Sequence, residues 1–401
     1  MASHASTGSL RSSDLVHPIV AGLISVIVNY GGTFVLVFQA AKVAGLSPSL
    51  TASWVWSISI GVGLTGILLS WVTREPIITA WSTPAAAFLV TALATTPYAE
   101  AVGAYLVAAA AFVILGLSGC FERVIGLIPP GIAAGLLAGI LLQFGIGAFG
   151  SLSVDPVLAG FLILAYLVFK RFTARYAIVG ILVLGLTFLL VQDRVDLAGL
   201  SLKLAAPVFT MPMFSLNALL SVALPLFLIT LTGQYMPGML VLRNDGFKTS
   251  ANPILTVTGL GSLLMAVFGS HGFNVAAITA AICTGKEAHE DPSKRWVAGV
   301  AAGGFYILVG VFGVTLAAVF MAFPATFIAT LAGLALLGTI GASLTLAMQD
   351  ARTREASLIT FLAAAANIKT LGIGGAFWGL VIGLLAYALL NGRLMRAGRR
   401  H

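Results

Sequence analysis

The sequence predicts an all-α polytopic membrane protein with about fourteen transmembrane segments, arranged as two inverted repeats of seven spans. Three observations predict this fold: an apolar composition, a charge asymmetry between alternate loops, and an internal repeat. Hydrophobic residues make up 59% of the 401 residues and charged residues only 8%, whereas a soluble domain carries roughly 25% charged residues. So few charges cannot cover a soluble particle of this size, and the chain is therefore expected to lie in lipid.

The apolar runs indicate helices, because they are continuous rather than alternating and because lipid admits only helices and closed barrels. They lie at 18–41, 52–72, 77–95, 98–119, 124–149, 153–169, 175–191, 214–240, 250–269, 272–284, 295–321, 324–347, 355–369 and 372–391. Residues 1–17 are polar and are expected to form a cytoplasmic tail before a retained first span. Spans 3 and 10, at 77–95 and 272–284, are irregular and are expected to contain short half-helices.

Lys and Arg are distributed unequally between alternate loops. With the N-terminus in the cytoplasm, the outside loops hold only Lys42, Arg194, Lys203 and Lys369 of the 21 Lys and Arg residues. Cytoplasmic loops of membrane proteins carry such an excess of positive charge. The asymmetry supports the number of spans and predicts that both termini are cytoplasmic. The net charge of +8 is spread thinly through short loops, which argues against a nucleic-acid partner.

Two halves of the chain resemble each other. PGIAAGLLAGILLQFGIGA (130–148) lies 194 residues before PATFIATLAGLALLGTIGA (324–342), and LISV (23–26) matches LLSV (219–222) at nearly the same offset. The irregular segments match each other as well. These matches predict a first repeat at 18–192 and a second at 214–392. Since seven is an odd number, the second repeat must be inverted, an arrangement typical of secondary transporters with a site at the bilayer midplane.

The irregular segments predict two short helices that begin near mid-membrane. Ser82 or Thr83 can cap one helix, whose first turn contains Pro84, and Asn274 can cap the other. A helix over 82–93 covers about 18 Å of a hydrocarbon core of roughly 30 Å. In an inverted repeat the two N-termini face each other, so free N–H groups and positive dipole ends converge on one place. Such a place suits a carboxylate, and the span centres offer no acidic residue for a cation.

The candidate residues also have structural interpretations. Ser82 and Thr83 can serve as caps alone, Tyr30 can be packing, and Gln234 can satisfy backbone freed by a nearby Pro-Gly pair. His271 titrates near neutrality and is a candidate for proton coupling, or it is a loop-end histidine bonded to a carbonyl oxygen. The candidate set for substrate binding is Tyr30, Trp81, Ser82, Thr83, Ala85, Gln234, Tyr235, Gly272, Phe273, Asn274, Val275 and Ala276.

Several motifs of other protein classes are missing from the sequence. No phosphate-binding loop GxxxxGK[ST], Ser/His/Asp set or metal-ligand spacing occurs, so we expect no metal, no other cofactor and no enzyme activity. Cys120 and Cys283 are interpreted as small buried hydrophobes. GVGLTG (61–66) fits GxGxxG, but it lies within a span with no strand before it. We interpret it as small-residue helix packing.

Five stretches resemble BenE-type benzoate/proton symporters: TAWSTPAAAFLVTAL (79–93), ALPLFLITLTGQ (223–234), HGFNVAAITAAIC (271–283), LAGLALLGTIGASL (331–344) and GGAFWGLVIG (374–383). That family is related in fold to uracil-permease-type nucleobase transporters and sulfate/anion exchangers. The resemblance implies a core domain at 18–120 plus 214–321 and a gate domain at 123–192 plus 324–392. It also implies a substrate held between them at the broken third and tenth spans, in a superfold whose members are often dimers.

The nucleobase transporters carry glutamates at spans 8 and 10, where this chain reads TGQYMPG and HGFNVAA. The lack of acid fits an anionic substrate, and it leaves the proton carrier open between His271 and entry of the protonated acid itself. We expect main-chain N–H groups over 82–86 and 274–277 to bind the carboxylate, and Tyr30, Trp81 and Phe273 to contact its ring.

The expected function is import of benzoate or a related aromatic carboxylate across a bacterial-type inner membrane, by proton symport with alternating access. The alternatives are a nucleobase or inorganic-anion transporter of the same fold and, less favoured, an ion channel.

Overall fold

The computed structural model describes residues 12–127, 129–174, 177–195, 202–277, 279–286, 288–368, 370 and 375–391. The elements of the first half are α1 (Ser12–Thr33), α2 (Val35–Val43), α3 (Pro48–Thr73), β1 (Thr79–Trp81), α4 (Thr83–Ala92), α5 (Tyr98–Ser118), α6 (Phe121–Leu127), α7 (Pro130–Gly150), a 3₁₀ turn (Ser151–Ser153), α8 (Pro156–Phe172) and α9 (Ala177–Val191). Of the predicted tail, residues 1–11 lie outside the described residues, and α1 already begins at Ser12. Span 3 consists of β1 followed by α4.

The second half is less regular. Its elements are α10 (Leu216–Ala218), a π-helical turn (Leu219–Ala223), α11 (Leu224–Thr230), a second π-helical turn (Leu231–Tyr235), α12 (Met236–Asn244), α13 (Ala251–Ala266), β2 (Phe273–Val275), α14 (Ala280–Thr284), a 3₁₀ turn (Pro292–Lys294), α15 (Trp296–Val311), α16 (Gly313–Met321), α17 (Ala325–Gln349), α18 (Arg354–Ala365) and α19 (Gly375–Asn391). The predicted segment 295–321 is bent by 72° between α15 and α16.

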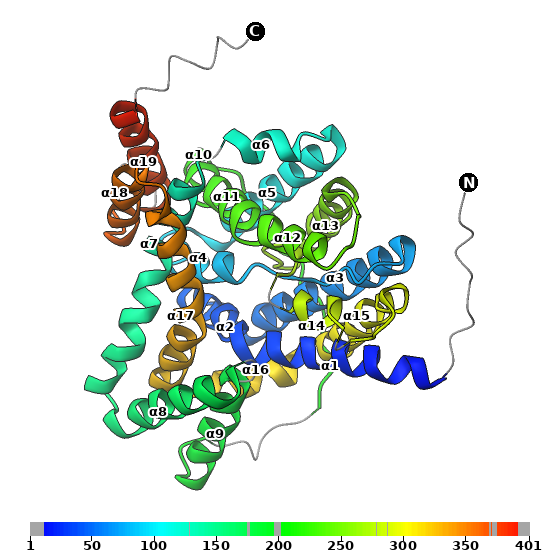
Figure 1. Ribbon diagram of the computed structural model, residues 1–401. Helices are drawn as coiled ribbons and strands as arrows, with labels where there is room; N and C mark the ends of the chain where they lie inside the picture. The colour runs from blue at the N-terminus through cyan, green and yellow to red at the C-terminus, as the bar shows by residue number, and fades with distance from the viewer. Residues whose placement is uncertain are drawn as a thin grey trace, which may run out of the picture.

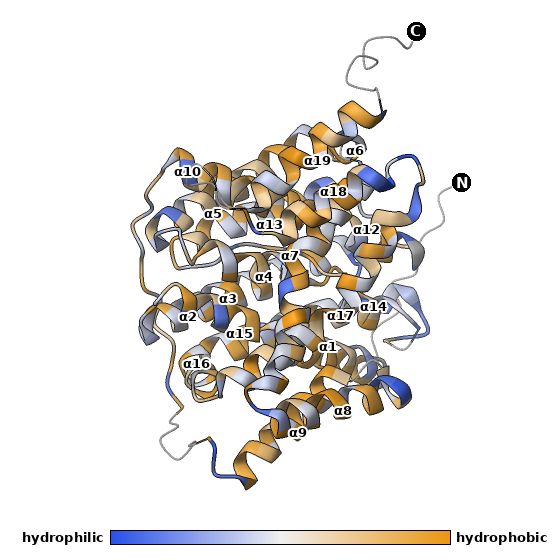
Figure 2. Ribbon diagram, turned by 90° about the vertical axis from the view of Figure 1, so that its left-hand side faces the viewer, coloured by the Kyte–Doolittle hydropathy of each residue, from blue (hydrophilic) through white to orange (hydrophobic). Residues whose placement is uncertain are grey.

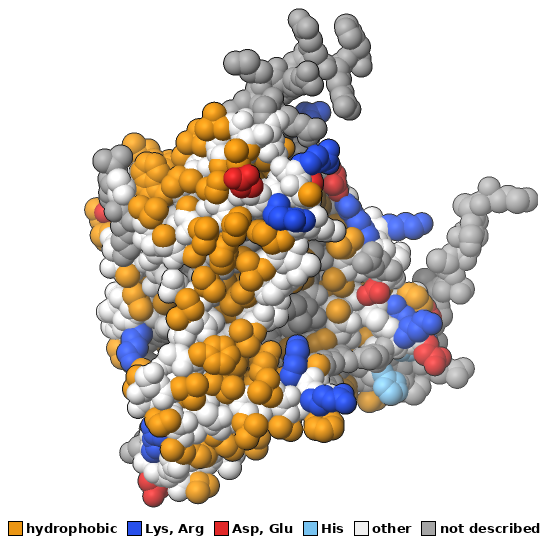
Figure 3. Space-filling view, turned by 60° about the vertical axis from the view of Figure 1, so that its left-hand side comes forward, with side chains coloured by type: hydrophobic (Ala, Val, Ile, Leu, Met, Phe, Trp, Pro, Cys, Tyr) orange, Lys and Arg blue, Asp and Glu red, His pale blue; other side chains and the backbone are white. Residues whose placement is uncertain are grey.

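The chain is a mostly helical, multi-pass membrane protein. Among the described residues six helices are long and apolar enough to cross a membrane, or up to seven if the bent pair of α15 and α16 forms one span. Apolar side chains also cover the outside: Leu117, Leu164, Phe172, Val191, Leu264 and Leu389 are among those exposed. Most helices in Figure 2 are coloured hydrophobic, and Figure 3 shows a largely apolar face with most visible Lys and Arg toward its right-hand side. A surface of this kind suits lipid rather than water.

The helices form two groups, which are separated in Figure 1. α7, α8, α9, α17, α18 and α19 lie on its left, and α7 packs along both α17 and α18. α3, α5, α12, α13 and α15 lie on its right, where α3 packs on α15 and α5 on α13. α4 and the π-helical turn Leu231–Tyr235 contact α7, and α1 and α2 also contact α17 of the left-hand group. We call the contact of α4 and the turn with α7 the seam.

The GVGLTG stretch lies within α3, and its glycines allow close helix packing. A Cβ atom on Gly63 would lie 2.6 Å from the carbonyl oxygen of Gly303 in α15, and one on Gly61 would lie 2.3 Å from the ring of Phe273. Real Cβ atoms do not approach other atoms so closely, so a larger side chain would force α3 away from its neighbours. The interpretation of the stretch as helix packing is confirmed.

Gly269 lies in the turn that joins α13 to β2, and its replacement by Ala is expected to be strongly destabilising. Its φ is +107°, and an added Cβ would lie 2.5 Å from the hydroxyl oxygen of Tyr98. Gly246 is the matched control, because its φ is +88° and an added Cβ would have no other atom within 4 Å. We expect G246A to cost about 1 kcal/mol through backbone strain alone. G269A should cost about 1–3 kcal/mol more through overpacking, measured as a lower melting temperature in detergent; equal losses would contradict the contact.

Candidate functional site

The two broken spans meet as a short antiparallel ribbon between helices. β1 pairs with β2, with Thr79 opposite Val275, Ala80 opposite Asn274 and Trp81 opposite Phe273. The N–H of Ala276 extends the ribbon by donating to the carbonyl oxygen of Ile78 at 2.8 Å. The ribbon is anchored where Thr79 Oγ1 donates to the Val62 carbonyl and the Phe273 N–H donates to Ser262 Oγ. Extended backbone is thus tolerated here because protein, not lipid, surrounds it.

The N-terminus of α4 lies at the end of β1, as the sequence predicts. Ser82 caps it, because its Oγ accepts the N–H of Ala85 at 3.2 Å, and the Ala86 N–H donates to the Ser82 carbonyl. Pro84 has no N–H. The Thr83 N–H is therefore the first-turn donor that makes no hydrogen bond to the described residues. Thr83 is half-buried whereas Ser82 is buried, and the positive end of the helix dipole lies at Thr83.

The second half-helix differs from the prediction. Asn274 is not its cap but lies in β2, and α14 begins only at Ala280, with Thr279 as its N-cap and no side-chain cap bond. The reason is the ribbon, because pairing with β1 holds residues 273–275 extended. The N–H of Ala276 is also occupied by Ile78. The sequence predicts two free helix N-termini at the site, and the described residues contain one, that of α4.

Asn274 instead contributes an unsatisfied side chain. It is fully buried, its Nδ2 donates to the Val275 carbonyl oxygen at 3.2 Å, and its Oδ1 has no hydrogen-bond partner. Since side chains alternate along a strand, the register places Asn274 on the same face as Ala80 and Ser82. Buried polar atoms are nearly always paired, so an orphan carbonyl oxygen here indicates a place for a ligand that donates a hydrogen bond.

The eighth span borders this site through its π-helical turn. A Cβ on Gly233 would lie 3.4 Å from Pro84 of α4 and 3.4 Å from Leu137 of α7, so Gly233 lies at the seam. Gln234 is half-buried and makes no hydrogen bond to the described residues. Tyr235 is not brought to the site: its hydroxyl is 2.6 Å from Thr258 Oγ1, and its ring packs on Phe112.

Aromatic side chains gather around Trp81. The ring centroids of Tyr30 and Phe34 lie 5.1 and 4.7 Å from that of Trp81, and Tyr306 lies at 6.1 Å, each with edge-on geometry. Trp81 Nε1 is buried without a hydrogen-bond partner. Phe34 and Tyr306 were not among the sequence candidates. Phe34 follows Tyr30 by four residues, so the helical period could have identified it.

Two hydrogen bonds hold this aromatic group in place. Tyr30 Oη lies 2.6 Å from Ser59 Oγ, and Asn29 Nδ2 donates to Tyr306 Oη at 2.7 Å. The α1 side of the group is therefore joined to both α3 and α15. Both phenols are engaged with neighbouring protein groups, so the unpartnered Nε1–H of Trp81 is the aromatic donor left for a ligand.

The remaining candidates support the ribbon. The Phe273 ring fills the space over Gly61 and Gly261. Gly272 has a φ of +103°, which allows the turn into β2. A Cβ on Gly238 would lie within 2.8 Å of Val275 and Ala276, so these two residues pack against α12. Ala85 is buried and donates its N–H to the cap.

His271 lies just before β2 and is buried. Its Nδ1 accepts the indole N–H of Trp54 at 3.2 Å. Its Nε2 faces the main chain of Ser82 without a well-formed hydrogen bond. The histidine thus lies between α3 and the cap of α4, and its role in proton coupling stays a prediction.

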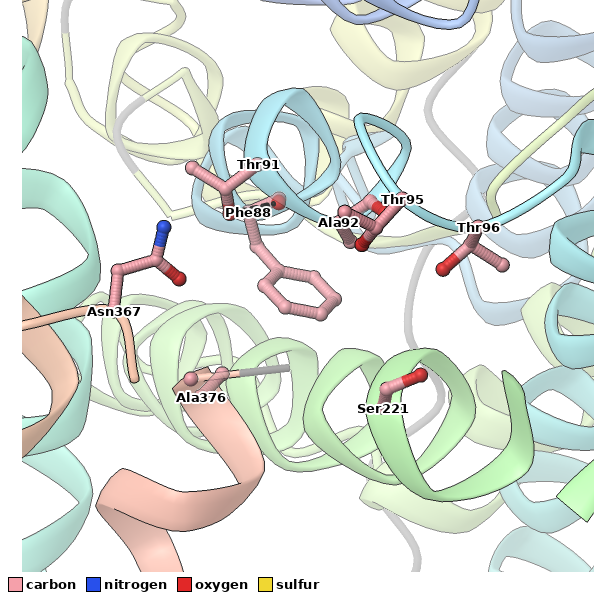
Figure 4. A pocket seen from close by; sticks show the side chains of 9 residues that line it. Phe88, Thr91, Ala92, Thr95, Thr96, Ser221, Asn367 and Ala376 are labelled. Atoms are coloured by element: carbon pink, nitrogen blue, oxygen red, sulfur yellow. Dashed lines mark hydrogen bonds between the residues drawn. The ribbon is translucent and has the colours of Figure 1, made fainter. Parts of the chain in front are cut away.

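One cleft opens near the other end of α4. It comprises about 290 Å³ of empty space that includes its opening. Figure 4 shows the ring of Phe88 in the middle of this cleft, with Thr91 and Asn367 on one side and Thr95, Thr96 and Ser221 on the other. It is lined by Phe88, Thr91, Ala92, Thr95, Thr96, Ser221, Asn367, Gly375 and Ala376. Because Asn367 and α19 belong to the left-hand group of Figure 1, the cleft lies between the two helix groups.

Comparison with known sequences identifies close relatives over the whole length. The family model "BenE: Benzoate membrane transport protein" matches residues 13–389. The chain is 42% identical to the benzoate membrane transport protein of Acinetobacter baylyi, covering 92% of this chain and 94% of the relative. It is 39% identical to the inner membrane protein YdcO of Escherichia coli, covering 93% and 95%.

Solved structures share the fold at low identity. The transmembrane domain of the cyanobacterial bicarbonate transporter BicA matches with a TM-score of 0.62 at 13% identity, over 94% of this chain and 98% of that one. SLC26A9 matches with a TM-score of 0.69 at 13% identity, over 95% of this chain and 66% of that one. These likenesses show the fold alone. The full-length family match and the two sequence relatives place the chain in the BenE family of benzoate membrane transport proteins, as a membrane transporter and not an enzyme.

Proposed function

We propose that this transporter imports benzoate or a related aromatic carboxylate across a bacterial inner membrane, together with a proton. The observation that carries the proposal is the start of α4. The Thr83 N–H there makes no hydrogen bond to the described residues, and Asn274 with its unpartnered oxygen lies on the same ribbon face as Ser82. Trp81, with the aromatic group around it, lies on the opposite face of the same ribbon. These groups match a carboxyl group attached to a ring. The name of the Acinetobacter relative supports benzoate, and that of the E. coli relative supports the inner membrane.

The charge of the site supports an acidic substrate over a cation. The described acidic residues that make polar contacts lie at helix ends: Glu75 accepts the N–H groups of Lys248 and Thr249, and Glu122 pairs with Arg243. None contacts the ribbon. A nucleobase needs paired donors and acceptors, and an inorganic anion needs no aromatic group. The Trp81 group therefore favours an aromatic acid over both alternatives on this fold.

The proposed architecture has fourteen spans in two inverted repeats, 18–192 and 214–392, with both termini in the cytoplasm. The antiparallel pairing of β1 with β2 supports inversion, because two equivalent strands related by a two-fold axis in the membrane must run in opposite directions. The two helix groups support a core domain at 18–120 plus 214–321 and a gate domain at 123–192 plus 324–392. A homodimer, which the fold implies, stays a prediction.

Transport would proceed by alternating access, with the core moving against the gate along the seam. Gly233, Pro84 and Leu137 are in contact there, so access to Thr83 requires the seam to open. The hydroxyl-lined cleft of Figure 4 lies beyond the C-terminal end of α4 and would serve as the vestibule on that side. An ion channel is disfavoured, because the described site contains no ring of charges or carbonyl oxygens.

Uptake of labelled benzoate into proteoliposomes tests the proposal. An inward proton gradient should drive accumulation that a protonophore abolishes, and unlabelled benzoate should compete while uracil and sulfate do not. Competition by uracil or sulfate instead would establish one of the alternatives on the same fold. Uptake no greater than in protein-free liposomes would refute the proposed function.

A further inference from the structure

We propose that the transported proton travels on the substrate, which occupies the site as the neutral carboxylic acid and donates its O–H to Asn274 Oδ1. The inference rests on the proposed function and names the form of the substrate that the site accepts. It makes Asn274 the residue that selects this form. No protein group then needs to change its protonation state.

The first argument is the identity of the orphan atom. The amide of Asn274 is oriented by its Nδ2, which donates to the Val275 carbonyl, so the unpartnered atom is the oxygen. A carbonyl oxygen only accepts hydrogen bonds, and so does a carboxylate. Two acceptors facing each other in a buried site repel. A carboxylic acid has one O–H to donate and one carbonyl oxygen to accept, and it can therefore satisfy Asn274 Oδ1.

The second argument is the small number of N–H groups that remain to bind the other oxygen of the substrate's carboxyl group. Pro84 has no N–H, and the N–H groups of Ala85 and Ala86 are both bonded to Ser82. The Thr83 N–H and the half-buried side-chain amide of Gln234 remain for the carbonyl oxygen of an acid. A buried carboxylate needs more donors than these, or a cation, because an isolated buried charge is far more costly than a neutral group.

The third argument is the lack of another proton carrier. His271 receives the Trp54 indole N–H on Nδ1, so that nitrogen carries no proton and Nε2 holds the single N–H of a neutral ring. An imidazolium would direct a second N–H against that of Trp54. The other titratable side chains near the site include four phenols. Tyr30 and Tyr306 are hydrogen-bonded to Ser59 and Asn29, whereas Tyr98 and Tyr105 pack on Trp54 beside His271. A phenol keeps its proton throughout the range in which benzoate gains one. We therefore assign His271 a positioning role at the α4 cap.

The proton balance is simple. Benzoate takes one proton from water onto a carboxylate oxygen as it enters, and the new O–H is donated to Asn274. On release to the other side, the O–H bond breaks and the proton returns to water. One proton moves with each substrate, and no net charge crosses the membrane.

Binding to the purified full-length protein at pH 5.5, 6.5 and 7.5 tests this inference, with benzamide as a second probe. Benzamide keeps one carbonyl acceptor and an N–H donor but does not ionise in this range. We expect the apparent Kd of benzoate to rise about tenfold per pH unit, as the neutral acid becomes tenfold rarer, and that of benzamide to stay constant. His271→Gln should retain the tenfold slope, whereas Asn274→Leu should lose both ligands.

Two outcomes would overturn the inference, and a third would refute the proposed function. A benzoate Kd that does not change with pH, together with no benzamide binding, would mean that the anion is bound. A slope lost in His271→Gln would make the histidine the carrier. Absence of benzoate binding at every pH would instead refute the proposed function itself, so the two failures are distinguishable.

Discussion

Replacing Asn274 by Leu is expected to weaken benzoate binding strongly while leaving the stability of the empty protein close to that of the wild type. Leu has nearly the shape of Asn, and the replacement removes a fully buried oxygen that has no partner. Removing such an atom should stabilise the protein by about 1–2 kcal/mol, but the replacement also removes the hydrogen bond from Asn274 Nδ2 to the Val275 carbonyl oxygen, and the two effects should nearly offset each other. Losing the hydrogen bond to the substrate should weaken binding on the order of 100-fold. Titration calorimetry and thermal unfolding in detergent measure the two effects.

Asn217→Leu is the matched control, because Asn217 is exposed at the start of the eighth span. It should change neither benzoate affinity nor stability appreciably. If Asn274→Leu destabilised the protein and left affinity for benzoate intact, Asn274 would be a structural residue of the ribbon, and the assignment of the site would be wrong.

Replacing Gly233 by Phe is expected to reduce transport at least 100-fold by filling the seam. A Cβ atom added at Gly233 would lie 3.4 Å from Pro84 and from Leu137, so a methyl group fits but a ring does not. Gly233→Ala should therefore retain most transport. The ring would either occupy the place of the substrate or hold core and gate apart, and both stop alternating access. Initial rates of benzoate uptake into proteoliposomes measure the effect.

Gly338→Phe provides the control for bulk alone, because nothing lies within 4 Å of the Cβ position at Gly338 of α17. It should transport like the wild type. Full activity of Gly233→Phe would show that the substrate passes elsewhere and that the seam does not open at Gly233.

Much of the fold could be predicted because lipid imposes it. Continuous apolar runs must be helical in hydrocarbon, and helices occupy most of the described residues in the predicted stretches, with β1 and β2 as exceptions in the two irregular ones. The start of α14 was predicted wrongly, since Asn274 before an apolar run has the appearance of a cap. Its extended conformation arises from pairing with β1, which is distant in sequence. Nothing in the sequence around residue 274 indicates that this segment pairs with β1.

Part of the candidate site could also be predicted, because polar residues are rare in a chain that lipid surrounds. Ser82, Thr83 and His271 stand out as polar residues within an apolar chain, and the structure places them together. Gln234 and Tyr235 were both candidates, yet adjacent helical residues point about 100° apart, and Tyr235 faces Thr258. Tyr306 was missed because α15 is apolar all round, so that no periodicity distinguishes the face that meets Trp81.

The most direct test of the central claim is a crystal structure with 4-bromobenzoate, in which anomalous scattering locates the bromine. We predict a single strong peak beside the Trp81 group, with the carboxyl group between the Thr83 N–H and Asn274 Oδ1. A bromine peak found only in the cleft formed by Thr91, Ser221 and Asn367, or only on the outer apolar surface, would contradict the account.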